Sequence, residues 1–198
     1  ALSFNLLKEF GIEINMDKIN KIAKKHGLLV IEDAAHSLGA TYKNRKVGTL
    51  ADMTILSFHA VKHITTGEGG MALTNNKKYY DKMMIFRTHG ITREVKSKEP
   101  WYYEMQDLGF NYRITDFQCA LGTSQLKKLD KFVSIRRRIA AIYDKQLYSI
   151  EGIELPYVHT YVKSSFHLYP IRLKGRLIGK KLGIFNKLRA LGLGVNVH

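Results

Sequence analysis

The sequence predicts an α/β protein, with a large domain over residues 1–150 and the start of a smaller α+β domain over residues 151–198. Short apolar runs alternate with helical patterns, which is typical of a mostly parallel central sheet with flanking helices. The first apolar run ends in carboxylates, at the position where open α/β sheets place ligands. Glu151, Gly152 and Pro156 then break a long helical pattern, which indicates a domain boundary near residue 150.

The first expected element is a helix over residues 16–26. Ile19, Ile22 and Ala23 recur at a spacing that puts them on one helical face. Asn15 precedes this segment and can cap the helix by accepting a hydrogen bond from a free backbone N–H group.

A buried strand is expected next. Gly27 can end the helix, and the apolar residues 28–31 then have the composition of a buried parallel strand. This strand runs directly into Glu32 and Asp33, so a carboxylate lies at its carboxyl end.

The following segment predicts a hairpin and two more strands. Residues 39–48 are rich in turn-forming residues, with Asn44 at the expected hairpin tip. Residues 53–58 predict a second buried strand, and residues 69–74 predict a third after a loop.

The rest of the chain is dominated by helical patterns. The expected elements are a helix from 77 to about 86, a polar irregular segment over 88–111, a helical pattern from 115 to about 148 with a bend at Gly122, a strand over 166–173, a helix over 180–191 and a strand beginning in 194–198.

A net charge of +15 is compatible with three kinds of partner: nucleic acid, an anionic membrane face or a phosphorylated small molecule. However, Lys and Arg are spread along the chain. The densest run, residues 136–138, lies in a helical pattern and is expected to form a solvated face. Zinc-finger spacing and RNP aromatic motifs are missing, so no nucleic-acid partner is expected.

The sequence favours a cytoplasmic protein without membrane association. No apolar stretch is long enough to cross a bilayer, and residues 1–10 have neither a basic leader nor a small-residue cleavage site. Cys119 is the one cysteine, which excludes an internal disulfide and fits a reducing compartment. Its apolar helical surroundings predict a position in the core.

Polar residues that could take part in catalysis or binding follow the first two predicted strands and precede the third. Lys62, in a loop closed by the glycines of segment 67–70, is a candidate amine nucleophile if burial and nearby cations favour loss of its proton. The Ser57 hydroxyl and glycine amides suit a phosphate, and a buried Asp33 requires a cationic partner such as a pyridinium nitrogen. By spacing alone, Asp33 can equally be a strand-end cap, and Lys62 a surface lysine.

These segments resemble a known family. The chain has Glu-Asp-Ala-Ala-His-Ser-Leu-Gly-Ala at 32–40, Ser-Phe-His-x-x-Lys-x-x-x-x-Gly-Glu-Gly-Gly at 57–70 and Gly-Phe-Asn-Tyr-Arg at 109–113. The order and content of these motifs resemble the DegT/DnrJ/StrS sugar aminotransferases, which are pyridoxal phosphate (PLP) enzymes of fold type I. The likeness covers about residues 16–198, and it implies the PLP-dependent transferase fold.

The resemblance implies a role for each residue that matches a family motif. Lys62 would bind PLP covalently and move a proton as general base and acid, and Asp33 would pair with the pyridine nitrogen. His36 would lie beside the cofactor ring, and Ser57 would bind the cofactor phosphate. Asn111 would reach the phosphate of the cofactor in the other subunit, so the active form is expected to be a homodimer with shared sites.

Within the family, the likeness is greatest to the 4-aminotransferases of pseudaminic acid biosynthesis. It implies glutamate as amino donor and a nucleotide-linked 4-keto-6-deoxy sugar, UDP-2-acetamido-2,6-dideoxy-4-hexulose, as substrate, for a surface glycan or a flagellin sugar. An enzyme for another nucleotide keto-sugar, such as the precursor of perosamine, stays open, as does a truncated non-catalytic or regulatory homologue. The segments with this likeness are 87–93, 100–104, 165–171 and 194–198.

Several aromatic residues and histidines are open to two readings. Trp101 is a candidate substrate-binding residue, or else packs a dimer interface. His198 is a candidate substrate-binding residue as well, and both it and His167 can equally be structural. His59 and His63 lie four residues apart, but their glycine-rich flanks indicate a loop and no carboxylate pair accompanies them, so no metal is expected.

The resemblance also implies further segments on both sides of the chain. Family members carry a preceding Gly-Thr/Ser-x-Ala-Leu type loop that holds the cofactor phosphate, and they continue past residue 198 into more of the small domain. Each charge-assisted phosphate hydrogen bond is worth roughly 1.5–3 kcal/mol. Residues 1–198 alone are therefore expected to bind PLP poorly and to lack measurable activity.

Overall fold

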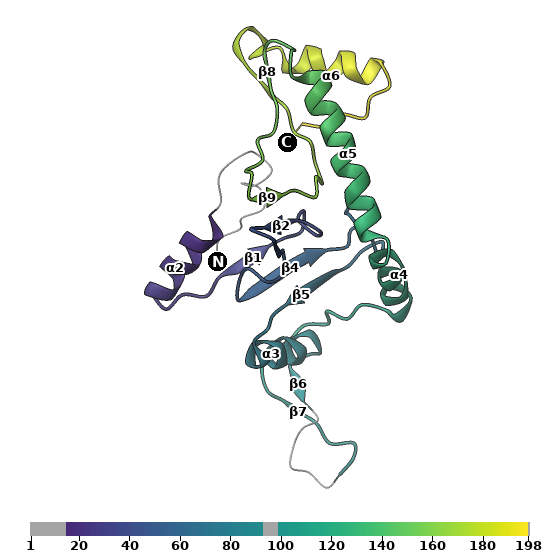
Figure 1. Ribbon diagram of the computed structural model, residues 1–198. Coiled ribbons are helices and arrows are strands. Elements are labelled where there is room, and N and C mark those ends of the chain that lie inside the picture. Colours follow the sequence, from purple (N-terminus) through teal and green to yellow (C-terminus); the bar gives the residue numbers. More distant parts are fainter. Residues whose placement is uncertain (1–14, 93–98, 198) are drawn as a thin grey trace.

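The structure is a computed structural model, and it describes residues 15–92 and 99–197. Figure 1 shows a central sheet of β1, β4 and β5 with helices around it, which confirms the α/β class. The elements, in chain order, are α2 (Met16–Lys25), β1 (Ile31–Asp33), β2 (Thr41–Tyr42), β3 (Arg45–Lys46), β4 (Met53–Ser57), β5 (Gly70–Leu73), α3 (Lys77–Arg87), β6 (Ile91–Thr92), β7 (Glu104–Met105), α4 (Asp116–Leu126), α5 (Leu129–Leu147), β8 (Ile153–Glu154), β9 (Val162–Lys163), β10 (Arg172–Leu173), a 3₁₀ turn (Gly175–Leu177) and α6 (Lys181–Ala190).

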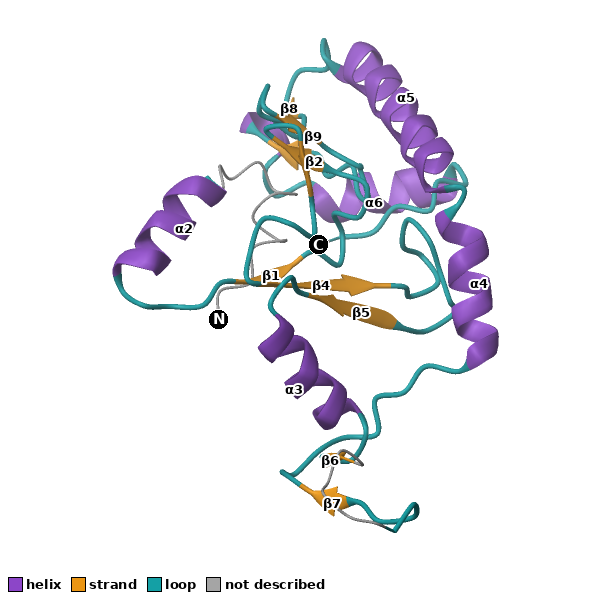
Figure 2. Cartoon of the chain, turned by 60° about the horizontal axis from the view of Figure 1, so that its bottom comes forward, coloured by secondary structure: helices purple, strands orange, loops and turns teal. Residues whose placement is uncertain are grey.

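The central sheet has the order β1-β4-β5. β1 and β4 are parallel, with Asp33 opposite Ile55. β5 is antiparallel to β4, with Gly70 opposite Ser57. The carboxyl ends of β1 and β4 and the start of β5 therefore meet at one edge of the sheet, which is the edge that carries Asp33 and Ser57 (Figure 2).

The first strand begins later than the apolar run 28–31 predicts. Of the residues in that run, only Ile31 belongs to β1. The two leucines at the start of the run are exposed, while Val30 is buried. The N–H group of Val30 donates to Asp52 Oδ2 at 2.8 Å, and its carbonyl accepts the N–H groups of Asp52 at 3.1 Å and Met53 at 3.2 Å. Val30 therefore pairs with the segment that begins β4, whereas the two leucines before it lie outside the sheet.

Helix α2 confirms the predicted cap. Asn15 Oδ1 accepts the N–H of Lys18 at 3.0 Å, and Gly27 follows the helix at a φ of 62°, a conformation that glycine adopts without strain. Ala23 lies in the core, whereas Ile22 on the same predicted face is 58 % exposed. Met16, Ala23, Val30, Tyr42 and Leu50 together form one of the two clusters of buried apolar side chains.

The predicted hairpin with Asn44 at its tip is confirmed. β2 and β3 pair in antiparallel fashion, and Lys43 and Asn44 between them both have positive φ, 46° and 62°. Two residues of positive φ form a turn that matches the twist of its strands. β9 pairs with the other side of β2, so a segment far along the chain extends this hairpin into a sheet of order β3-β2-β9.

The helical pattern over 115–148 is divided between α4 and α5, which part at residues 127–128, so the predicted bend at Gly122 is wrong. Gly122 lies inside α4, where a Cβ would come within 2.9 Å of Thr66 Cγ2. The glycine thus permits close packing of α4 on the loop after β4. Cys119, predicted in the core, is exposed on α4.

Two of the three arginines predicted to form a solvated face are partly buried. Arg137 donates to Ser164 O at 2.7 Å and to Gly39 O at 3.2 Å, and Arg136 donates to Phe166 O at 3.3 Å. Both guanidinium groups donate to backbone carbonyls of residues 163–167, here called the strap, of which only Lys163 belongs to a strand. The prediction of a solvated face was wrong because it could not foresee these distant acceptors.

The C-terminal strands are shorter than predicted. Of the expected strand over 166–173, only β10 forms, and it pairs with β8. Phe166 has a φ of 49°, which is incompatible with an extended strand. Residues 194–197 are not in a strand, and His198 lies outside the described residues. Helix α6 confirms the predicted helix, and the division at residue 150 stays a prediction.

Residues 88–92 and 99–111, here called the arm, project beyond α3 in both views (Figures 1 and 2). β6 and β7 pair within it. Its base is closed by a bond from His89 N–H to Phe110 O at 2.8 Å. Gly90 and Gly109 lie so close together there that a Cβ on either would overlap the backbone of the opposite segment. Within residues 15–92 and 99–197, no helix is long and apolar enough to span a membrane.

Candidate active site

Asp33 and Ser57 lie at the same edge of the sheet, both half-buried. Asp33 Oδ1 accepts the N–H of Ala35 at 3.0 Å, while the N–H of Ala34 donates to Ile55 O at 2.8 Å. The carboxylate thus caps the turn after β1, as one of the two predicted readings requires. The same bond holds the carboxylate group in a defined orientation at the sheet edge.

Lys62 is half-buried in the segment that joins β4 to β5, residues 58–69, here called the lysine loop. The loop is closed by backbone bonds from Phe58 N–H to Gly69 O at 2.8 Å and from Thr66 N–H to Phe58 O at 2.9 Å. Lys62 itself donates its N–H to His59 O at 3.0 Å. These bonds hold both ends of the loop together at the sheet edge that carries Ser57.

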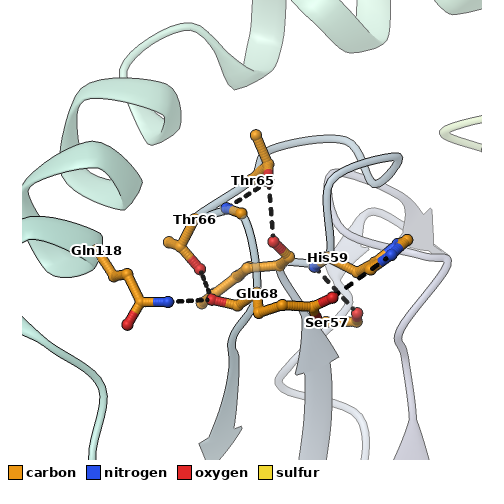
Figure 3. Close-up of polar contacts among 8 residues, drawn as sticks. Ser57, His59, Thr65, Thr66, Glu68 and Gln118 are labelled. Atoms are coloured by element: carbon orange, nitrogen blue, oxygen red, sulfur yellow. Dashed lines mark hydrogen bonds and ion pairs between the residues drawn. The ribbon is translucent and has the colours of Figure 1, made fainter.

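Hydroxyl groups stiffen the lysine loop from within (Figure 3). Thr65 Oγ1 donates to Phe58 O at 3.1 Å and accepts the N–H of Gly67 at 2.8 Å. Thr66 Oγ1 donates to Glu68 O at 2.7 Å. The two hydroxyl groups thus bond backbone groups that lie outside the strands and helices.

The lysine loop is also held from outside. Gln118 Nε2, on α4, donates to Glu68 O at 2.9 Å (Figure 3). His59 Nε2 lies 3.7 Å from Glu68 Oε1, and the N–H of His59 contacts Ser57 Oγ at 3.4 Å. The Ser57 hydroxyl therefore sits where the strand turns into the loop, next to the backbone amides that begin it.

Three histidines gather beside Lys62. Sequence reasoning considered His36 and His63 together, but it missed their contact with His167. The ring centroids of His36 and His167 are 4.2 Å apart, and those of His63 and His167 are 5.4 Å apart. His36 and His63 come from the two motif segments, but His167 comes from the strap. The histidine spacing along the chain contains no signal for this contact. In the part of the chain that the structure describes, no three His, Cys, Asp or Glu side chains are arranged to hold a metal ion.

Burial and positive neighbours keep two of these histidines neutral near pH 7. Burial, and after it the positive charge of Arg136, lowers the pKa of His63 to about 4. Burial likewise lowers the pKa of His167 to about 3, with smaller contributions from His36 and Lys62. The imidazoles of His63 and His167 therefore add no positive charge beside Lys62.

The predicted residues of segment 100–198 lie elsewhere. Asn111 is exposed and bridges to Thr88 at the base of the arm, and Trp101 is 74 % exposed further along it. The arm lies on the other side of α3 from β1 (Figures 1 and 2), so within one chain it is separate from the edge that carries Asp33. His198 lies outside the described residues, so its predicted role is not addressed.

Comparison with known proteins agrees with this geometry. Residues 8–198 match the model of the DegT/DnrJ/EryC1/StrS aminotransferase family. The chain belongs to this family. Its aminotransferases depend on PLP, and the prediction of fold type I is confirmed.

One relative and two solved structures show how far the likeness extends. A UDP-4-amino-4,6-dideoxy-N-acetyl-beta-L-altrosamine transaminase of Campylobacter jejuni is 44% identical over 188 residues, which are 95% of this chain and 49% of that protein. The structure of Helicobacter pylori PseC, an aminotransferase involved in the biosynthesis of pseudoaminic acid, is 34% identical with a TM-score of 0.85, over 96% of this chain and 49% of PseC. The PLP form of Spr1654, a putative sugar aminotransferase of Streptococcus pneumoniae, is 28% identical with a TM-score of 0.84, over 99% of this chain and 53% of that one. The chain thus spans about half the length of the curated relatives it matches.

The side chains at the sheet edge suit the family's cofactor. PLP has a basic ring nitrogen, an aldehyde and a phosphate, and these three groups call for a carboxylate, an amine and hydroxyl or amide donors. Asp33, Lys62 and Ser57 are of those three types, and the first and last flank the same edge. The three side chains therefore have the chemical groups that PLP binding requires.

Proposed function

We propose that this protein transfers an amino group from glutamate to the keto carbon of a UDP-linked 4-keto-6-deoxy sugar, with PLP as cofactor. The observation that carries the proposal is the convergence of Asp33, Ser57 and the lysine loop at one edge of the sheet. The sugar is chosen from the likeness to the Campylobacter jejuni enzyme, whose name specifies a UDP-linked amino sugar. UDP-2-acetamido-2,6-dideoxy-4-hexulose is the proposed substrate.

Four residues of this chain would hold the cofactor. The amine of Lys62 would bind it covalently, and the carboxylate of Asp33 would pair with its ring nitrogen. The Ser57 hydroxyl, next to the N–H of His59, would donate to the phosphate. His36, three residues after Asp33, would lie beside the ring. When bound, PLP withdraws electrons from the carbon that exchanges a proton.

The residues of the chain then do the remaining work. The N–H of Ala35 holds the carboxylate of Asp33 in place, and this carboxylate would pair with the ring nitrogen. The amine of Lys62, when it is not bonded to the cofactor, would take a proton from one carbon and return it to another as general base and acid. The closed lysine loop keeps that amine close to the reacting atoms. A cytoplasmic location belongs to the same proposal, since the one cysteine of the sequence fits a reducing compartment.

The test is product analysis with the full-length protein. Incubation with PLP, glutamate and UDP-2-acetamido-2,6-dideoxy-4-hexulose should yield 2-oxoglutarate and a UDP-linked 4-amino sugar in equal amounts, measured by mass spectrometry and NMR. A GDP-linked 4-keto-6-deoxy sugar serves as the comparison substrate. If only the GDP sugar is aminated, the proposed sugar is wrong. If glutamate loses its amino group to neither sugar, the proposed reaction is wrong.

A second copy of the chain is the proposed partner. Several large apolar side chains on the arm and α4 are exposed, and surfaces of this kind mark contact sites. By resemblance, Asn111 at the base of the arm would reach the cofactor phosphate of the other subunit. The exposed side chains in question are Trp101 (74 %) and Leu108 (78 %) on the arm, Phe117 (91 %) on α4 and, in the segment between them, Tyr112 (71 %).

Shared sites predict recovery of activity when two inactive variants are mixed. A hybrid of a Lys62→Ala subunit and an Asn111→Ala subunit contains one intact site and one doubly altered site. Random exchange makes about half of the dimers hybrid, so about a quarter of wild-type activity should return. Exchange is verified with differently tagged subunits. Exchanged dimers that stay inactive would contradict the role of Asn111 across the interface.

A further inference from the structure

His63 joins the lysine loop to the strap. It follows Lys62 directly and is only 3 % exposed. Its Nε2 lies 3.3 Å from Ser165 O, an acceptor 102 residues further along the chain. Ser165 is 1 % exposed, so this contact is closed to solvent on both sides. Through this buried contact, the strap can fix the position of the lysine loop.

The hydrogen-bond partner of His63 determines which of its ring nitrogens carries the proton. A carbonyl oxygen can only accept, so Nε2 must carry the proton and donate it. With the ring neutral, Nδ1 is then an acceptor, and among the described residues it has no partner. Burying an imidazole nitrogen without a hydrogen-bond partner costs free energy. A histidine is therefore a poor residue for this position if its role is only to fill space in the core.

The strap that accepts this bond is itself held firmly. Arg136 donates to Phe166 O at 3.3 Å and to His167 O at 3.4 Å, and Arg137 donates to Ser164 O at 2.7 Å. Phe166 between them is in the left-handed region, at a φ of 49°, and it stays there although this conformation is unfavourable for a residue with a Cβ. The two arginines of α5 thus provide a rigid support for Ser165.

We propose that His63 is a positioning residue that fixes the location of the Lys62 amine by bonding the lysine loop to the strap. This inference rests on the proposed function of Lys62. The bonds inside the loop set its shape, whereas the His63 bond sets where the whole loop lies relative to α5. A lysine side chain has four rotatable bonds, so its reach depends on a backbone that does not move.

The effect is expected in the chemical step. A reacting group displaced by about 1 Å can cost about a hundredfold in rate, while substrate contacts elsewhere are unaffected. Loss of the His63 bond should therefore lower kcat per bound PLP by about tenfold to a hundredfold. KM for the sugar should stay near its wild-type value, because the side chain of His63 is buried and not exposed to substrate.

The experiment compares three substitutions in full-length holoenzyme. His63→Leu removes the donor and keeps an apolar side chain of similar size. His63→Gln places an amide N–H near the position of Nε2 and should restore most of kcat. His63→Asn is polar as well, but its shorter side chain cannot reach Ser165 O, so it should resemble the leucine variant. Val133→Ala, a buried change on α5 outside this contact, is the control for lost packing and should keep its kcat per bound PLP.

A second measurement needs neither sugar nor cofactor. In cofactor-free full-length protein, Lys62 is acylated with a limiting amine-reactive reagent, and its labelling is read by peptide mass spectrometry relative to an exposed lysine. Lys62 should label severalfold faster in His63→Leu and His63→Asn than in wild type or His63→Gln, because a released loop exposes it.

The outcomes separate cleanly. Unchanged kcat and labelling in His63→Leu and His63→Asn overturn the proposal, and so does a glutamine variant that is as impaired as they are. If His63→Leu does not fold, the comparison of His63→Gln with His63→Asn decides alone. A wild-type enzyme that aminates no sugar would defeat the proposed function, yet the labelling comparison would still test the contact.

Discussion

Replacing Lys62 by alanine is expected to abolish transamination in the full-length enzyme. The variant loses both the amine that would bind PLP covalently and the base that would move the proton, and acid–base catalysis alone contributes typically 10²–10⁴-fold. The visible absorbance of lysine-bound PLP should disappear as well. Absorbance and release of 2-oxoglutarate are measured on the same sample.

A matched control distinguishes chemistry from folding. Lys46→Ala removes an exposed lysine on β3, away from the sheet edge, and should keep full activity. Circular dichroism should show that both variants are folded. Normal turnover by Lys62→Ala would exclude Lys62 as the reactive amine, and a new search among the remaining lysines would be required.

Asp33→Asn is expected to bind PLP but to lower kcat by at least about a hundredfold, which equals a loss of about 2.7 kcal/mol of transition-state stabilisation. The amide cannot supply the negative charge that would keep the ring nitrogen protonated, so the ring withdraws electrons less well. Its Oδ1 can still accept the N–H of Ala35, and the turn after β1 should therefore persist. PLP content and kcat are measured together.

Asp52→Asn is the corresponding control. Asp52 also accepts a backbone N–H, that of Val30 at 2.8 Å, but it lies just before the start of β4 and so at the opposite edge of the sheet. Its amide variant should keep wild-type kcat. If Asp33→Asn behaves like Asp52→Asn, the cap is the whole role of Asp33, and the proposed pairing with the ring nitrogen is wrong.

Local chemistry made part of the structure predictable. Asn15 and Asn44 lie where a short polar side chain satisfies or shapes the nearby backbone, and both were found as expected. The strand before Lys62 was predictable for a related reason. Its apolar run contains no glycine or proline, and Met53–Ser57 forms β4. In each case the partner lies within a few residues or in the sheet that the run itself forms.

Contacts across long stretches of chain were not predictable. The Arg137 bond to Gly39 O spans 98 residues, and the His63 bond to Ser165 O spans 102. Backbone carbonyls accept in both, and every residue has one, so residue type identifies no partner. Cys119 shows the same difficulty for apolar patterns. An apolar helical pattern predicts a helix, but α4 has no buried residue among those described, and the pattern does not say what covers it.

The contact between Gly90 and Gly109 divides the arm into a base and an outer part that differ in how well they tolerate substitution. At Gly90 and Gly109 any side chain would overlap backbone, so substitution there must deform the fold. Farther out, Trp101 is 74 % exposed. We therefore expect the base of the arm to tolerate almost no substitution, whereas a change at an exposed position such as Trp101 should leave the backbone of the arm in place.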